Sequence, residues 1–236
     1  AVISLGTSHT YFAAMTKPTV DPAGYGHVFG NPAGGYMSLI CFKNGALAQE
    51  HVRERHGLDW KAFDACLLNT PAGNNGNMML PYVVSEITPL VLEEGTVCQG
   101  STAFEAGDDS AAAVRAVVEA QALRLRIHSA WIEDDAETVR VTGGASVSDP
   151  VCQILADVFE ARIERLETGN SAGLGAAMRA AQGVGAADWA TLKAAFCQPA
   201  AGRDLAPKQE NVRIYREVLR RYRAFAEAHC QAATQQ

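Results

Sequence analysis

The sequence predicts one α/β domain, because strand-like runs come first and strand–helix alternation follows. Residues 1–14 and 36–42 are rich in alternating and β-branched residues, whereas residues 137–166 pass from strand to helix to strand. The composition agrees with this class. Of 236 residues, 48% are hydrophobic and 19% are charged, which is typical of a packed globular protein.

The first elements surround a small turn. Apolar and small residues alternate over 1–14 around Gly6-Thr7-Ser8, a pattern that predicts a β-hairpin with a tight turn. Residues 17–36 are rich in proline and glycine, so irregular structure or an edge strand is expected there. Tyr36 to Phe42 is expected to form a further strand.

Two helices and an interrupted strand come next. A helix is expected over about 44–56, ended by Gly57. A second helix runs to about residue 68 from Asp59, whose short carboxylate suits an N-cap. Pro81 lies within the apolar run 78–84, and proline in a strand favours an edge position.

Polar residues 86–109 are predicted to form a long loop. The strongest helix of the chain follows over 110–128, with one apolar stripe and the arginines on the other side. The stripe consists of Val114, Val117, Val118, Gln121 and Leu125.

The C-terminal half alternates between strands and helices. Tyr215, Tyr222 and Phe225 have helical spacing and are expected in the core. Gly173 and Gly175 resemble a dinucleotide G-x-G, but they lie in a run of small residues, so close helix packing is the preferred interpretation. The predicted elements are strands over 137–142 and 163–166 and helices over about 150–159, 170–182, 188–196 and 208–231.

One glycine turn suggests ligand binding. The β-branched residues before it lead into Gly143-Gly144, and Ser148 opens the next helix. A glycine turn lets a backbone approach a nucleotide closely, and a helix start offers free N–H groups to phosphate or ribose oxygens. An ordinary strand–helix turn has the same pattern, and Ser148 could serve only as an N-cap.

Charge and cysteine content exclude several classes. The net charge is −6 without a basic block, so a nucleic-acid partner is not expected. No apolar run has the length of a membrane span, so no membrane partner is expected either. Six scattered cysteines without a C-x-x-C pair indicate reduced thiols and a cytoplasmic protein. The six histidines lack ligand spacing, so no metal site made of side chains is expected, and Glu86 and Glu119 are expected to be structural.

Several blocks in one order resemble the C-terminal domain of FGGY carbohydrate kinases, most closely the xylulokinases. Ala1 starts within a strand-like run, which itself suggests the C-terminal part of a longer protein. The blocks are Ser4-Leu-Gly-Thr-Ser8, Pro71 to Tyr82 continuing to Pro89, Arg115-Ala-Val-Val-Glu119, Thr142-Gly-Gly-Ala145 with Gln153-Ile-Leu-Ala-Asp157, Ser171 to Ala177, and Lys208 to Tyr222.

The resemblance implies an RNase-H-like domain of the actin/hexokinase-like ATPase kind, a mixed sheet with helices on both faces. All of 1–236 would be the ATP-binding half of a kinase for a ketose such as xylulose, using ATP and Mg²⁺. The sugar-binding domain and the catalytic aspartate would precede Ala1, so no catalytic residue is assigned in this chain, and the isolated piece should be inactive. The nucleotide-contacting residues so implied are Gly6, Thr7, Ser8, Gly45, Gln49, Gly143, Gly144, Ala145 and Ser148.

The resemblance leaves several alternatives open. A non-catalytic nucleotide-binding module of the actin/Hsp70 kind shares the fold, and the substrate could instead be gluconate, ribulose or glycerol. Gln49 could equally be a solvated helix residue. The predicted partners are ATP, a small sugar and the protein's own N-terminal domain, and an exposed hinge surface would make a homodimer plausible.

Overall fold

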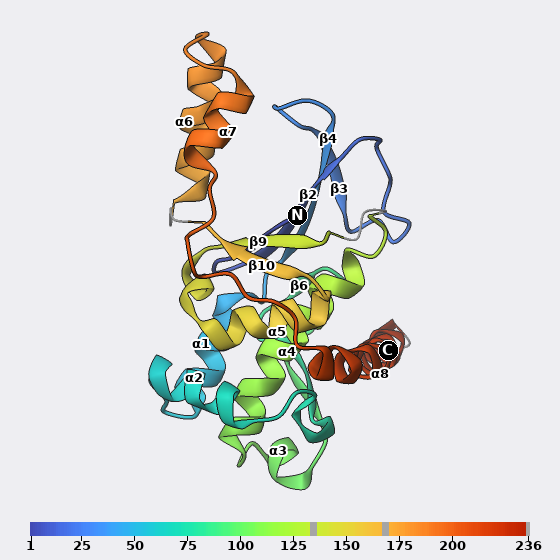
Figure 1. Cartoon of the computed structure of the whole chain (residues 1–236). Helices are drawn as coiled ribbons and strands as arrows, with labels where there is room; N and C mark the ends of the chain where they lie inside the picture. Colours follow the sequence, from blue (N-terminus) through green and yellow to red (C-terminus); the bar gives the residue numbers. More distant parts are fainter. Residues whose placement is uncertain (133–135, 167–169, 235–236) are drawn as a thin grey trace.

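A six-stranded mixed sheet forms the centre of the computed structural model, which describes residues 1–132, 136–166 and 170–234 (Figure 1). The strand order is β10-β9-β1-β2-β4-β3. β1 is parallel to β9 and β9 to β10, whereas β2, β3 and β4 pair in antiparallel fashion. The strands are β1 (Val2–Leu5), β2 (His9–Met15), β3 (His27–Gly30), β4 (Tyr36–Phe42), β9 (Thr138–Thr142) and β10 (Arg162–Arg165). The predicted fold class and hairpin are confirmed, and β3 is an edge strand.

Helices lie on both sides of this sheet. The long helix α4 runs beneath it together with α1 and α5, while α6 and α7 stand on the opposite side near β10 (Figure 1). α8 lies against α4 and α5, so the end of the described chain is part of the main body. The helices are α1 (Ala46–Arg55), α2 (Trp60–Asn69), α3 (Thr102–Ala106), α4 (Ser110–His128), α5 (Asp149–Phe159), α6 (Ser171–Gly183), α7 (Trp189–Phe196) and α8 (Gln209–Thr234).

One face of the sheet carries the core. Along β1 and β2 the side chains of Ile3, Leu5 and Tyr11 are buried, while their neighbours Val2 and Phe12 are only half-buried. This alternation follows from the two-residue period of a strand, which sends successive side chains to opposite faces. Burial of each large apolar side chain contributes roughly 1.5–3 kcal/mol, so this face holds the strands in register against α4 and α5.

The prediction that the arginines of α4 face away from the core is wrong. All residues from 112 to 125 are buried, including Arg115 and Arg124. The helix passes through the middle of the molecule, with the sheet, α1, α2, α5 and α8 around it. Each buried guanidinium has a carboxylate partner, Glu119 for Arg115 and Glu86 for Arg124, and this pairing permits burial.

The region 86–109 is not the long loop that its polarity predicts. β6 (Glu86–Ile87) and β7 (Leu90–Val91) form a two-stranded sheet, and α3 follows shortly before α4. β8 (Gly95–Gln99) pairs with β5 (Met78–Tyr82) in another two-stranded sheet, so β5 does lie at an edge as Pro81 predicts. These strands are too short for a periodic signal, because two to five residues complete at most two periods.

The prediction of close helix packing at Gly173 and Gly175 is also wrong. Both glycines are exposed on α6, and a Cβ atom at Gly175 would meet nothing within 4 Å. α6 packs mainly on α7, and Met178 is its one buried residue in the described part of the chain. A run of small residues therefore marks a lightly covered helix here rather than a tight interface.

Candidate nucleotide-binding site

The turn between β1 and β2 is held by the start of α1. The carbonyl oxygen of Gly6 accepts from Ala46 N at 3.0 Å, and that of Thr7 accepts from Leu47 N at 3.4 Å. In a trans peptide the C=O and the following N–H point in opposite directions. The N–H groups of Thr7 and Ser8 therefore point away from α1, and they have no acceptor among the described residues. Successive free N–H groups of this kind form a ready anion site.

Glycine at position 45 is required by the close approach of this turn. A Cβ atom there would lie 2.6 Å from His9 N and 2.7 Å from Thr7 O. Gly45 is the N-cap of α1, and no side chain caps the helix. The hairpin carbonyls accept the first N–H bonds of α1 in place of a cap, so the helix and the turn form one unit.

The second glycine loop follows β9, which is the neighbour of β1 in the sheet. Gly143 has φ +94°, and a Cβ atom on it would lie 2.7 Å from the backbone of Leu5. A short 3₁₀ turn, η2 (Gly144–Val147), leads to Ser148, which caps α5 by accepting from Val151 N at 3.4 Å. Because β1 and β9 are parallel neighbours, both glycine loops leave the sheet at the same edge.

The two loops line one cavity of about 650 Å³. Of the nine residues predicted to contact a nucleotide, six line it: Gly6, Thr7, Gln49, Gly144, Ala145 and Ser148. Ser8, Gly45 and Gly143 are not among the lining residues. Gly45 and Gly143 instead permit the backbone contacts that set the shape of the cavity, and Ser8 is exposed beside it. Gln49 is buried, and its Nε2 donates to Gln121 Oε1 at 2.6 Å. The alternative that Gln49 is a solvated helix residue is therefore wrong.

Sequence reasoning missed the opposite wall of the cavity. Helix α2 contributes Trp60, Phe63 and Asp64, and Glu50 projects from α1. One signal was present in the sequence, because Trp60 and Asp64 lie one helical turn apart and therefore on one face of α2. The sequence does not show that α2 lies opposite the glycine loops, because this position results from the packing of α2 on α4 and α5.

The cavity offers backbone dipoles rather than cationic side chains. No lysine or arginine is among the described residues that line it, whereas Glu50 and Asp64 carry carboxylates. A highly charged anion such as a triphosphate would need a divalent cation here to offset these charges. The described residues contain no cluster of three His, Cys, Asp or Glu side chains suited to a metal ion, so the anion itself would have to supply most of the ligands.

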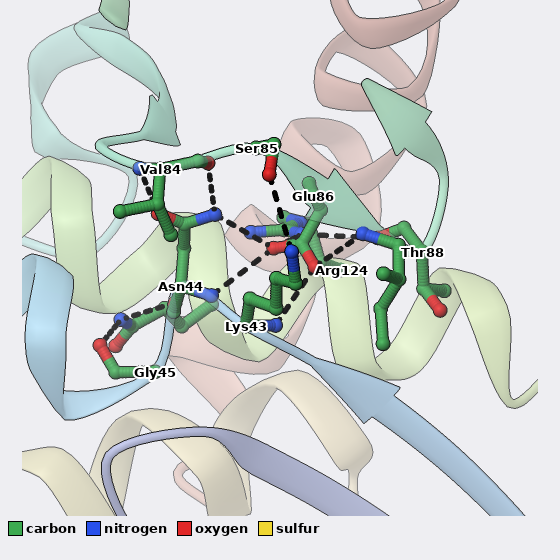
Figure 2. A network of polar contacts seen from close by, with 10 residues as sticks. Lys43, Asn44, Gly45, Val84, Ser85, Glu86, Thr88 and Arg124 are labelled. Carbon is green, nitrogen blue, oxygen red and sulfur yellow. Dashed lines mark hydrogen bonds and ion pairs between the residues drawn. The ribbon is translucent and has the colours of Figure 1, made fainter. Parts of the chain in front are cut away.

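A buried ion pair fixes the turn before α1 (Figure 2). Arg124 Nη2 lies 2.5 Å from Glu86 Oε2 and donates to Thr88 O at 2.9 Å. Glu86 also accepts from the backbone N–H groups of Lys43, at 2.8 Å, and of Asn44, at 3.2 Å. The carboxylate thus connects the central helix to the turn that positions Gly45, and the prediction that Glu86 is structural is confirmed.

The pKa of Glu86 reflects this arrangement. Burial alone would raise the pKa, but the charge of Arg124 and the hydrogen bonds from Arg124, Asn44 and Ile87 outweigh it and hold the pKa below its usual value. Glu119 is the second structural carboxylate. It accepts from Arg115, Gly73 N and Tyr215 Oη at 2.7–2.9 Å and so joins α4 to α8.

His9 makes the stability of this region depend on pH. Burial, assisted by the positive charge of Arg124, lowers its pKa from 6.5 to about 3. The unfolded chain therefore binds a proton near pH 6.5 that the folded chain does not, and stability decreases as the pH falls below 6.5. We expect His9 to account for about 2 kcal/mol of lost stability between pH 7.5 and pH 5. Urea unfolding of wild type and His9→Gln at both pH values tests this, and an identical pH dependence would contradict it.

The family model described as the C-terminal domain of the FGGY family of carbohydrate kinases matches residues 1–184. The chain belongs to the FGGY carbohydrate kinase family. A xylulose kinase of Rattus norvegicus is 36% identical over 236 residues, which cover 93% of this chain and 42% of that protein. A xylulose kinase of Mus musculus is also 36% identical, over 94% of this chain and 41% of that protein. The chain thus spans about two fifths of the length of these FGGY relatives.

Solved structures of FGGY kinases share the fold of this chain. A ligand-bound xylulose kinase of Lactobacillus acidophilus superposes with a TM-score of 0.85 at 20% identity, over 96% of this chain and 46% of that one. A Plasmodium falciparum glycerol kinase with ADP gives a TM-score of 0.74 at 14% identity, over 99% of this chain and 46% of that one. These likenesses confirm the actin/hexokinase-like ATPase fold. Across the described residues, no helix combines the length and apolar character needed to cross a bilayer.

Proposed function

We propose that this FGGY domain binds ATP and forms the nucleotide half of a kinase that phosphorylates a ketose such as xylulose. The observation that carries the proposal is the shared cavity, in which the Gly6–Ser8 turn and the Gly143–Ala145 loop meet. The xylulose kinases among the relatives support the substrate class. The intact protein would transfer the γ-phosphoryl group of ATP to a sugar hydroxyl.

The residues of the cavity suit the two ends of a nucleotide. The free N–H groups of Thr7 and Ser8 and their hydroxyls would hold the β- and γ-phosphates. Gly144 and Ala145 would pass beneath the ribose and base, since neither has a side chain beyond Cβ. Magnesium fits this site as a phosphate-bound ion, because Mg²⁺ keeps several waters and needs few protein ligands, and it would neutralise charge on the phosphates. The residues of this chain would contribute by positioning the nucleotide and its phosphates for the transfer.

The remaining parts of the reaction lie outside this chain in the proposal. An aspartate before Ala1 would take the proton of the sugar hydroxyl, and a second RNase-H-like domain would bind the sugar. Closure of the two domains over the cavity would exclude water. The protein would act in the cytoplasm. A surface that contacts the second domain in the intact protein would, when uncovered, allow a homodimer.

Thr7→Val provides the test of this proposal. The substitution keeps the shape of the side chain and removes the hydroxyl, so we expect kcat/KM for ATP in the full-length protein to fall by about tenfold or more. A coupled assay of ADP release with a panel of ketoses, aldonates and polyols measures it. Thr10→Val is the matched control, because Thr10 lies on β2 of the same hairpin but outside the cavity lining.

One result would overturn the kinase, and another would change only its substrate. Absence of ATP-dependent phosphorylation with every pentulose, hexulose and polyol would overturn it. If MgATP nevertheless bound to the cavity, the non-catalytic nucleotide-binding module would be the correct alternative. Preferred turnover of gluconate, ribulose or glycerol would keep the reaction and change the substrate.

A further inference from the structure

A buried amide on α4 holds the start of α1. Gln121 belongs to the apolar stripe of α4 and is only 5% exposed, yet it does not line the cavity. Its Nε2 donates to Gly45 O at 2.7 Å and to Asn44 O at 3.1 Å, and its Oε1 accepts from Gln49 Nε2 at 2.6 Å. An apolar residue would fill the stripe without the cost of burying polar atoms. The position of this amide is therefore explained by its contacts with α1 and with the turn before it.

The protons of this cluster determine which way each amide faces. Both N–H groups of Gln121 Nε2 serve carbonyl oxygens, those of Asn44 and Gly45. If the Gln121 amide turned over, its oxygen atom would face two other acceptors with no proton between them. Its Oε1 must therefore face Gln49, and Gln49 must present Nε2 to it. Gln121 thus fixes the orientation of the Gln49 amide without lining the cavity itself.

Gln49 connects this cluster to the cavity. It belongs to the cavity lining, and its Oε1 and the second proton of its Nε2 have no partner among the described residues. These groups therefore remain available to a ligand. An amide that is already held in one orientation loses less conformational entropy when a ligand binds, and this raises the affinity.

The same side chain of α4 also holds the turn before α1. Gly45, whose carbonyl oxygen is bonded to Gln121, is the N-cap of α1. The two residues after Gly45 donate their N–H groups to carbonyl oxygens of the Gly6–Ser8 turn. One amide thus supports both the phosphate-facing turn and Gln49, which follows one helical turn later.

We propose that Gln121 is a positioning residue of the nucleotide site, which raises the affinity for ATP without touching it. The proposal rests on nucleotide binding in this cavity and extends it to a residue outside the lining. Because Gln121 acts through Gln49 and the Gly45 turn, its loss weakens nucleotide binding in the same way as the loss of Gln49.

A double-mutant cycle tests this proposal. Methionine has the unbranched shape of glutamine and lacks the amide, so Gln121→Met and Gln49→Met remove the contact with little change in volume. We expect each single variant of the full-length protein to bind MgATP about tenfold more weakly in calorimetric titrations. The double variant should bind no more than about threefold more weakly than Gln121→Met, because the two amides act together.

Steady-state kinetics distinguish positioning from a merely structural role. A structural defect would reduce the fraction of folded enzyme, which lowers kcat and leaves KM for ATP unchanged. In Gln121→Met, KM for ATP should instead rise about tenfold, whereas KM for the sugar should stay within about twofold of the wild-type value.

Val114→Ala is the matched control, because Val114 is fully buried two turns earlier on the same face of α4 and does not line the cavity. This variant should be less stable than the wild type and bind MgATP equally well. If Gln121→Met does not fold, Gln121→Asn takes its place in the cycle, since its amide is one methylene too short to reach both partners.

Unchanged MgATP affinity in either glutamine variant, or losses that simply add in the double variant, would overturn this inference and leave the proposed function intact. A loss of affinity in Val114→Ala as large as that in Gln121→Met would overturn it in the same way. Absence of MgATP binding to the wild type would overturn both the inference and the proposed function.

Discussion

Replacing Glu86 with glutamine is expected to lower the free energy of unfolding by about 3–5 kcal/mol. The substitution removes the charge that pairs with Arg124, whose side chain is only 3% exposed. An uncompensated guanidinium would then remain between the rings of Phe42 and Tyr82, whose centroids lie 5.0 and 5.4 Å from it. Urea unfolding at pH 7.5 measures the loss, and nucleotide affinity should fall with it because the turn before α1 loses its anchor.

A double substitution distinguishes the ion pair of Glu86 with Arg124 from the hydrogen bonds that Glu86 accepts from the backbone of Lys43 and Asn44. Exchange of a buried ion pair for apolar side chains is often neutral in stability. Glu86→Leu combined with Arg124→Met should nevertheless remain destabilised by about 2 kcal/mol or more, because the N–H groups of Lys43 and Asn44 also lose their acceptor. Recovery of wild-type stability in the double variant would show that the turn does not depend on Glu86.

Lys43→Met is the control for this experiment. The Lys43 ammonium donates to Ser85 Oγ at the exposed edge of the same network, at 3.1 Å. An exposed contact of this kind contributes little, so stability should change by no more than about 0.5 kcal/mol. A loss comparable to that of Glu86→Gln would place the critical contact at the surface rather than in the buried pair.

The sequence predicts the main sheet and the long helices because each repeats its period several times. The alternation of β2 and the capped start of α2 at Asp59 are local signals that tertiary packing leaves unchanged. The burial of Arg124 is different, because it depends on a carboxylate 38 positions away in a strand of two residues. A helix surrounded by the sheet and four other helices has no solvent face, and the polarity of its own residues does not reveal this.

The candidate site likewise has features that the sequence predicts and features that it does not. The glycine turns are visible in the sequence, because they are needed where a backbone approaches another backbone closely, as at Gly45 and Gly143. The sequence does not distinguish such supporting glycines from Gly144, which lines the cavity. Nor does it reveal the bond from Ser148 to Asp64, since a contact across 84 positions exists only after α2 has packed on α5.

Gly143→Ala is the second substitution with a large expected effect. Gly143 has φ +94° and ψ 173°, a region essentially restricted to glycine, and its new Cβ would lie 2.7 Å from the Leu5 backbone. Neither the loop nor β1 can yield without breaking the parallel pairing of β1 with β9. We expect a loss of about 3 kcal/mol or more in the free energy of unfolding, measured by urea denaturation at pH 7.5.

Gly144→Ala is the matched comparison, because the same methyl group is added one residue later. A Cβ atom at Gly144 would meet nothing within 4 Å, so stability should change by no more than about 1 kcal/mol. The methyl group would project where the cavity is lined, and nucleotide affinity should therefore fall by tenfold or more if the backbone lies against the ribose and base. The two neighbouring glycines are thus expected to have different roles: Gly143 is needed for the stability of the fold, and Gly144 for the affinity for the nucleotide. Unchanged affinity in a stable Gly144→Ala variant would remove this loop from the nucleotide contact.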